Sequence, residues 1–227
     1  MVGIWSKNGQ GWKMVKKVKI WKVLRMGLPI VENLSGLCGN IFSLFKSFQL
    51  HVHKKSQKWL NYNIIPDQVI GDLDSISEKA STKLEEWIVS NKNIQKTDLE
   101  KAVDFAFEKG ATKVTIIGWS GGRIDHTLAA LGLAFNPKIK LIDDLFTIRA
   151  VNDAITIEGE EGTLFSLIAM LEARVSVTGA KWNLKQEKLT IGGRGIHNEI
   201  DSSGKTTIEC HSGNLLLAQG NFVLHHD

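Results

Sequence analysis

The fold is decided by one stretch of the sequence, residues 114–126, which reads VTIIGWSGGRIDH. Its first four residues are β-branched, which predicts a buried strand, and an apolar helix is expected at 125–133. Between them lie Gly118, Gly121 and Gly122. Glycines that lead from a strand into a helix N-terminus expose backbone N–H groups, so this loop is suited to bind an anion. It matches neither the Walker loop nor the dinucleotide-binding Gly-x-Gly-x-x-Gly pattern.

Strands and helices alternate on both sides of this stretch, from about residue 61 to 143. The hydrophobic pattern predicts strands at 68–70 and 140–142, and helices at 77–90 and 97–109. Alternation of this kind is typical of parallel strand pairing. We therefore expect an N-terminal Rossmann-like α/β/α layer.

Short strands separated by turns replace this pattern after about residue 145. Regular short strands without helices predict an all-β sandwich or barrel. The chain is accordingly expected to divide into a basic segment at 1–58, an α/β domain at 59–143 and a β-rich domain at 144–227. The strands of the last part are expected at 146–151, 154–157, 164–169, 174–178, 188–191, 206–210 and 215–218.

Charge is distributed unevenly along the chain. Residues 1–60 hold 11 lysines and arginines and a single acid, Glu32, whereas the remainder carries a net charge of −6. Residues Met14, Val18, Trp21 and Arg25 have helical spacing, so a basic amphipathic helix that binds a membrane or nucleic acid competes here with a solvated extension. The solvated extension is the favoured interpretation.

Composition excludes several protein classes. The chain has 227 residues, two cysteines and three prolines, which excludes a disulfide framework and long disorder. No apolar run approaches the roughly 18 residues that a spanning helix needs, and no signal peptide fits the N-terminus. We expect a cytoplasmic protein that binds neither membrane nor nucleic acid.

Two carboxylates, Asp72 and Asp74, follow the strand that ends at Gly71, and Ser75 follows them. Like charges so close together disfavour ionisation unless a cation lies between them, and Mg²⁺ prefers such ligands together with phosphate oxygens. The alternative is an acidic turn in which Asp74 or Ser75 caps the next helix. On spacing alone, the turn is favoured.

A second candidate group, Thr97, Asp98 and Lys101, lies at the start of the predicted helix 97–109. Thr97 or Asp98 is suited to cap this helix, and Asp98 is also suited to be a third metal ligand. Lys101 is placed to reach a phosphate, although a lone lysine is more often a solvated surface residue.

After the glycine loop come Arg123, Asp125 and His126. Arg123 is suited to bind a phosphate through two hydrogen bonds. Asp125 is suited to orient Arg123, to bind metal or to cap the helix. His126 more often satisfies a local hydrogen bond than acts as a catalyst.

The β-rich half offers Trp182, His197 and Asn198. A tryptophan after a turn is able to stack on a flat heterocycle, and an asparagine is able to read ring nitrogens through its amide. The alternatives are core packing for Trp182 and turn formation for Asn198.

Taken together, these stretches resemble the thiamin pyrophosphokinase family. The resemblance lies in PDQVIGDLDSI at 66–76, TDLEKA at 97–102, GGRIDH at 121–126, GAKWNL at 179–184 and the pair Asn198-Glu199. Each motif alone is weak, but their order across about 61–220 is specific. The resemblance implies an ATP- and Mg²⁺-dependent transfer of a diphosphoryl group to thiamin, with AMP as the second product, in a homodimer.

The resemblance also implies roles for individual residues. Asp72, Asp74 and Asp98 would hold Mg²⁺ on the ATP phosphates, and Asp74 or Asp98 would accept the hydroxyl proton. Lys101 would join these three aspartates as a catalytic residue. The ATP side of the cleft would further include Gly71, Ser75, Gly121, Gly122, Arg123, Asp125 and His126. The thiamin side, contributed across the dimer interface, would include Trp182, His197 and Asn198.

The sequence departs from the family pattern in three places. Residues 50–56, LHVHKKS, lack the Asp-Gly-Gly or Asp-Gly-Ala loop that the family carries there. Gln95 only approximates the glutamine that precedes the Thr-Asp pair, and His197 stands where a serine is usual. These departures keep two alternatives open: a catalytically impaired relative that binds thiamin or nucleotide, and a binder of anionic surfaces through residues 1–58.

Overall fold

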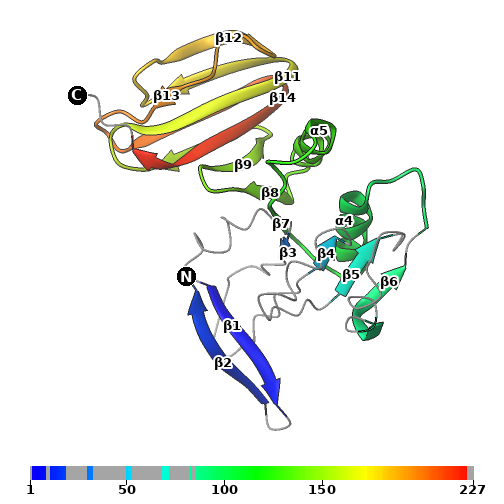
Figure 1. Ribbon diagram of the computed structural model, residues 1–227. Helices are drawn as coiled ribbons and strands as arrows, with labels where there is room; N and C mark the ends of the chain where they lie inside the picture. The colour runs from blue at the N-terminus through cyan, green and yellow to red at the C-terminus, as the bar shows by residue number, and fades with distance from the viewer. Residues whose placement is uncertain are drawn as a thin grey trace.

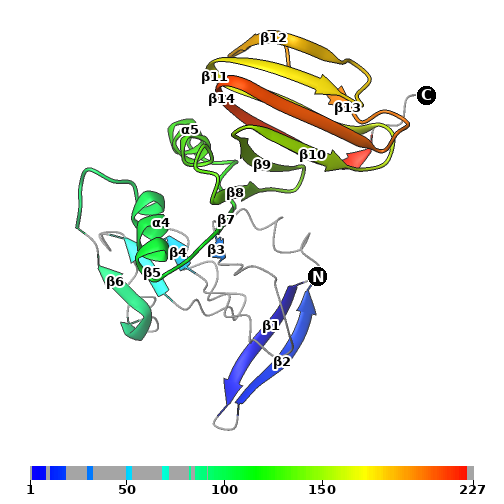
Figure 2. The same cartoon turned by 180° about the vertical axis from the view of Figure 1, so that it is seen from behind.

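The computed structural model describes residues 2–8, 11–18, 30–32, 50–52, 68–71, 82, 85–90 and 92–223. Within them the protein consists mostly of β-sheet with few helices (Figures 1 and 2). The N-terminal elements are β1 (Val2–Asn8), β2 (Gly11–Val18), β3 (Ile30–Glu32), β4 (Leu50–Val52), β5 (Gln68–Gly71), the 3-10 turn η2 (Glu85–Trp87) and β6 (Ile88–Ser90). They are followed by α4 (Asp98–Glu108), β7 (Val114–Ile117), α5 (Ile124–Leu133), β8 (Ile139–Ile142), β9 (Phe146–Val151), β10 (Ala154–Glu158), β11 (Thr163–Thr178), β12 (Leu184–Thr190), β13 (Asn198–Glu199) and β14 (Lys205–Val223).

One large sheet runs through the molecule in the order β12-β11-β14-β9-β8-β7-β3-β4-β5-β6, while β1 and β2 form a separate antiparallel sheet. The pairs β4–β5, β5–β6 and β7–β8 are parallel. Because β3 is antiparallel to both β4 and β7, the strands β4, β5, β6, β7 and β8 all point in the same direction. The loops that follow them therefore leave from one edge of the sheet, where ligands bind in open α/β sheets.

Strand β14 joins the two halves of the molecule because both of its faces are buried over residues 215–218. Leu216 and Ala218 pack into the cluster that also holds α4 residues and β8, whereas Leu215 and Leu217 pack into the core of the β-rich half. Strand β9 lies between β8 and β14 and pairs with both. The sheet is thus continuous across residues 143–150, where the sequence pattern changes.

Both described helices contribute to one apolar cluster. Ala102, Val103 and Ala106 of α4 belong to it, and Leu131 and Leu133 of α5 pack against it. The described residues therefore show helices packed on one cluster of the sheet, and a three-layer α/β/α arrangement stays a prediction. None of the described helices is long and apolar enough to cross a membrane.

Two sequence-based predictions of local structure were wrong, and one alternative, a helix that includes Met14 and Val18, was wrong as well. Most of the predicted helix 77–90 lies outside the described residues. Its last three residues form strand β6 instead of a helix, because the β-branched Ile88 and Val89 pair with β5. The helical spacing of Met14 and Val18 does not give a helix there, because 11–18 pairs with 2–8 as a strand.

The third correction concerns the β-rich half. The segments predicted at 164–169 and 174–178 are one strand, β11, and those at 206–210 and 215–218 are one strand, β14. Register shifts between Ala169 and Ala173 and between Arg174 and Val175 interrupt the β11–β14 ladder. Such bulges bend a strand without ending it, so each strand continues through the residues that separate the two predicted segments.

Candidate active site

The candidate site lies along the edge where the like-directed strands end. The described residues place two loops there: the segment that follows β6 into α4, and the glycine loop between β7 and α5. Residue Gly71 ends β5 and is buried, and the next residues, Asp72, Asp74 and Ser75, lie outside the described residues. Their predicted roles at this edge therefore stay predictions.

Helix α4 begins with a complete capping box. The hydroxyl of Thr97 accepts a hydrogen bond from the backbone N–H of Glu100 at 3.2 Å, and the Glu100 carboxylate accepts one from the Thr97 backbone N–H at 2.8 Å. This arrangement satisfies two N–H groups that would otherwise lack partners. Since Thr97 caps the helix, the Asp98 side chain is left for another role.

Asp98 forms an ion pair with Lys101 one turn further along the helix. Lys101 Nζ lies 3.0 Å from Asp98 Oδ1, and the side chains are only 4% and 13% exposed. The alternative of a solvated surface Lys101 is therefore wrong, because α4 packs against the sheet and buries this side chain. The pair holds the Asp98 carboxylate in one place beside the sheet edge.

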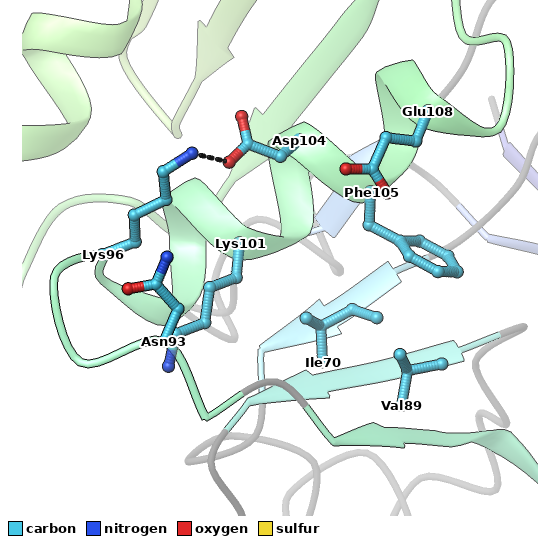
Figure 3. Close-up of a pocket in the computed structure, with 8 residues that line it drawn as sticks. All are labelled: Ile70, Val89, Asn93, Lys96, Lys101, Asp104, Phe105 and Glu108. Carbon is cyan, nitrogen blue, oxygen red and sulfur yellow. Dashed lines mark hydrogen bonds and ion pairs between the residues drawn. The ribbon is translucent and has the colours of Figure 1, made fainter.

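A pocket of about 170 Å³ lies beside this ion pair (Figure 3). Ile70 of β5 and Val89 of β6 form its floor, and Lys101 and Phe105 reach it from α4. On the rim, Lys96 Nζ lies 2.5 Å from Asp104 Oδ2. The pocket is thus lined by both charges and by apolar side chains.

The glycine loop between β7 and α5 is tied to the end of β8. Gly118 and Gly121 have φ angles of 70° and 79°, which side chains rarely allow. The Ser120 hydroxyl lies 3.5 Å from Asp143 Oδ2, and Asp143 Oδ1 accepts backbone N–H bonds from residues 145 and 146. Asp143 therefore links two neighbouring strand ends at the edge of the sheet.

Arg123 and Asp125 form a second, solvent-exposed ion pair. The guanidinium donates two hydrogen bonds to the carboxylate, from Nε at 3.1 Å and from Nη2 at 2.5 Å. The hydrogen bond from Arg123 lowers the pKa of Asp125, and the backbone N–H of His126 lowers it further. Asp125 thus orients Arg123 at the N-terminus of α5, which is one of the roles considered for Asp125 from the sequence. The neighbouring His126 is exposed.

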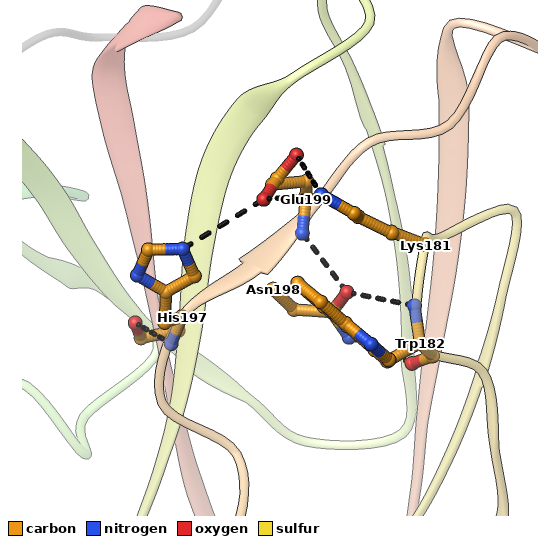
Figure 4. Close-up of polar contacts among 6 residues, drawn as sticks. Lys181, Trp182, His197, Asn198 and Glu199 are labelled. Carbon is orange, nitrogen blue, oxygen red and sulfur yellow. Dashed lines mark hydrogen bonds and ion pairs between the residues drawn. The ribbon is translucent and has the colours of Figure 1, made fainter. Parts of the chain in front are cut away.

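In the β-rich half, the Asn198 side chain forms hydrogen bonds with both the backbone N–H and the backbone carbonyl of Trp182 (Figure 4). Its Oδ1 accepts the Trp182 N–H at 3.2 Å, and its Nδ2 donates to the Trp182 carbonyl at 2.8 Å. Asn198 is buried, and its Oδ1 also accepts the Glu199 N–H at 2.9 Å. Trp182 is 48% exposed, so it does not pack in the core.

Lys181 and His197 lie next to the Trp182 ring. Lys181 Nζ is 4.7 Å from the ring centroid and 3.2 Å from each oxygen of the buried Glu199 carboxylate. The His197 ring meets Trp182 edge to face, with 6.3 Å between centroids, and its Nε2 lies 3.7 Å from Glu199 Oε1. His197 has a φ of 64°, and its N–H donates to the Ser166 hydroxyl.

Sequence reasoning gave no role to three residues of these sites. Asp143 was not singled out, whereas Lys181 and Glu199 were quoted only as part of the stretches that resemble the family. Among the residues that the structure describes, no three His, Cys, Asp or Glu side chains gather as a metal site. Of the three predicted metal ligands, only Asp98 lies in that part of the chain.

Comparison with known proteins adds two family matches. Residues 43–143 match the family model described as the catalytic domain of thiamin pyrophosphokinase. Residues 154–215 match the model described as its vitamin B1 binding domain. The two matches follow one another along the chain and include every described candidate residue.

Individual relatives agree with these matches. Thiamine pyrophosphokinase of Bacillus subtilis is 32% identical over 169 residues, which cover 68% of this chain and 79% of the relative. The crystal structure of a Bacillus subtilis thiamine pyrophosphokinase superposes with a TM-score of 0.68 at 28% identity, covering 78% of this chain and 89% of that one. A thiamin pyrophosphokinase family protein of Enterococcus faecalis shares the fold, with a TM-score of 0.66 at 19% identity and coverage of 76% and 88%.

Proposed function

The chain belongs to the thiamin pyrophosphokinase family, and from that premise we propose that it transfers the diphosphoryl group of ATP to the hydroxyl of thiamin. The products are thiamin diphosphate and AMP. One observation carries the proposal: matches to the catalytic and to the vitamin B1 binding domain follow in order along one chain. Neither the impaired relative nor the anionic-surface binder gains support from any comparison.

The ATP phosphates are proposed to bind at the edge where β5, β6 and β7 end. Gly71, Ser75, Gly121, Gly122 and the exposed Arg123–Asp125 pair would surround them, with His126 beside the helix start. Backbone N–H groups at the N-terminus of α5 favour negative charge there. Because Arg123 is exposed and already oriented, it is able to exchange its carboxylate partner for a phosphate oxygen.

Mg²⁺ is proposed to be held by Asp72, Asp74 and Asp98. The donor set fits this ion, since all three are carboxylates, and Lys101 contacts only Oδ1 of Asp98. When bound, the ion would neutralise charge on the phosphates. The buried Lys101 would fix the Asp98 carboxylate and add positive charge to the same edge.

The reaction requires the thiamin hydroxyl oxygen to bond to the β-phosphorus of ATP while the bond from that phosphorus to the α–β bridging oxygen breaks. The hydroxyl proton passes to a carboxylate, for which Asp74 and Asp98 are the candidates. The chain's own contribution is to orient the two substrates and to neutralise charge.

The thiamin side is proposed to consist of Trp182, His197 and Asn198. The half-exposed indole of Trp182 offers a flat surface, and Asn198 fixes the backbone that carries it. We further propose a homodimer in which the ATP side of one subunit meets the thiamin side of the other across the interface. The domains are proposed to span residues 59–143 and 144–227, and the location to be cytoplasmic.

The test is AMP formation from ATP and Mg²⁺, with and without thiamin. Wild-type protein is expected to form AMP only with thiamin, and Asp72→Ala and Asp98→Asn are expected to abolish it. Glu172→Gln is the control, because this glutamate forms an exposed pair with Lys188 in the β-rich half and does not line the candidate site. Absence of thiamin-dependent AMP from the folded wild-type protein would refute the proposal.

A further inference from the structure

The Lys181 ammonium occupies a position between an aromatic ring and a buried carboxylate. It lies over the Trp182 ring, 4.7 Å from its centroid, and contacts both oxygens of Glu199 at 3.2 Å (Figure 4). The Glu199 side chain is only 4% exposed, whereas that of Lys181 is 42% exposed. The carboxylate therefore belongs to the protein interior, and the lysine links it to the surface where Trp182 lies.

The backbone around this lysine is held as tightly as its side chain. The Lys181 N–H donates to the Glu199 carbonyl at 3.0 Å, and Ala180 forms a bridge with Ile200. Glu199 lies in β13, which pairs with the buried β11. The turn that carries Lys181 and Trp182 is thus held by backbone contacts to Glu199 of β13 and to Ile200.

A buried carboxylate strongly favours a cation nearby, and an ammonium over an indole face is attracted by the ring. Both interactions act on the same Lys181 nitrogen, so the nitrogen connects the position of the ring to that of Glu199. The indole has two rotatable bonds, and backbone clamping by Asn198 does not fix them. The ring itself is contacted by the Lys181 ammonium and by the edge-to-face His197 ring, and of these two only Lys181 ties it to the buried Glu199 through two hydrogen bonds.

We propose that Lys181 and Glu199 are positioning residues of the thiamin site, which fix the Trp182 ring so that a flat ligand ring stacks on the face that Lys181 does not cover. This inference rests on the proposed function, because it takes thiamin as the ligand. Neither residue needs to touch the substrate. Their effect on thiamin binding passes through Trp182.

The first test replaces Lys181 by methionine, which keeps the length of the stem and removes the charge. Lys181→Met is expected to raise the Kd and KM for thiamin about tenfold, while the KM for ATP and kcat change less than about twofold. Lys181→Arg is expected to restore thiamin binding, because a guanidinium also stacks on aromatic rings and pairs with carboxylates. Lys205→Met is the control, since Lys205 forms an exposed pair with Glu158 in the same half of the molecule.

A double-mutant cycle separates positioning from general loss of structure. In a Trp182→Leu background, Lys181→Met is expected to change the thiamin Kd less than about twofold, because the ring through which the lysine acts is gone. If Lys181→Met alone fails to fold, the double variant Lys181→Met, Glu199→Gln removes both charges and is expected to fold, since removing a buried pair together is far less harmful than removing one partner.

The outcomes distinguish this inference from the proposed function. Wild-type protein that binds thiamin while Lys181→Met binds it equally well would overturn the positioning role alone. An equal loss in the wild-type and Trp182→Leu backgrounds would also overturn it. Folded wild-type protein that neither binds thiamin by calorimetry nor forms AMP from it would overturn both.

Discussion

Each half of the molecule contains a lysine–carboxylate pair beside a candidate substrate site, and the two pairs differ in how far the lysine is buried. In the α/β half, the lysine is the more buried partner: Lys101 is 4% exposed and Asp98 13%. In the β-rich half, the carboxylate is the buried partner: Glu199 is 4% exposed and Lys181 42%. A third pair, Arg123–Asp125, is exposed at both partners, at 74% and 56%.

The difference indicates what each pair is able to do for a ligand. In the first pair the lysine is buried together with its carboxylate and holds Asp98 beside the sheet edge, which suits a site for a cation. A buried glutamate leaves an ammonium at the surface side, where it orients an aromatic ring. An exposed pair such as Arg123–Asp125 contributes little to stability and is therefore able to rearrange around an anion.

The largest effect is expected from Lys101→Met. It leaves the Asp98 carboxylate without its partner in a largely buried position, so the free energy of unfolding is expected to fall by about 3 kcal/mol. Urea denaturation measures this change, and AMP formation is expected to be lost as Asp98 shifts. Lys96→Met is the control, because its pair with Asp104 is exposed, and no measurable loss of stability is expected. Equal effects of the two substitutions would contradict the assignment of Lys101 to the core.

Removing the Asn198 hydrogen bonds to the backbone of Trp182 and Glu199 is expected to have the next largest effect on stability. Asn198→Ala removes three hydrogen bonds from buried or half-buried backbone groups, so we expect a loss of about 2 kcal/mol and weaker thiamin binding. Asn183→Ala removes a single bond to the Ala180 N–H in the same turn, and about 1 kcal/mol is expected. A larger loss from Asn183→Ala would show that Asn198 is not the main anchor of this turn.

Local signals in the sequence predicted the elements that carry the α/β half of the site. Helix α4 begins at Asp98, within one residue of the predicted start, with Thr97, one of the two predicted caps, as its N-cap. Strand β7 occupies 114–117, as its run of β-branched residues indicates. The glycine loop and α5 follow within one residue of the expected start. These features depend on neighbouring residues, which is why the sequence alone sufficed.

Features that depend on distant pairing were not predictable in the same way. The burial of Lys101 follows from the packing of α4 on the sheet, and the pairing of Glu199 with Lys181 follows from a contact across 18 residues. The continuity of β11 and β14 depends on bulges that let a ladder pass irregular residues. A pattern read along one strand carries no information about its partner, so such strands were divided.

A smaller, selective effect is expected from Arg123→Gln. Because the side chain is exposed, the unfolding midpoint is expected to stay unchanged, while the KM for ATP rises about tenfold through loss of a charged contact to phosphate. Steady-state kinetics with ATP varied at saturating thiamin measure this change. Arg194→Gln, which breaks an exposed pair with Glu187, is the matched control. An unchanged KM for ATP would remove Arg123 from the proposed phosphate site.

The smallest effect concerns the titration of Asp125. Its pKa lies below the ordinary value of 3.8, chiefly because Arg123 donates hydrogen bonds to the carboxylate. A lowered pKa means that the pair favours the folded state above pH 3.8 and that this contribution is lost as the pH falls through the lower value. Carboxyl carbon NMR of the wild type and of Arg123→Gln measures this: the pKa is expected to return towards 3.8 in the variant. The backbone N–H of His126 remains in the variant and keeps part of the shift, so a variant pKa identical to the wild-type one would assign the shift to the helix start rather than to Arg123.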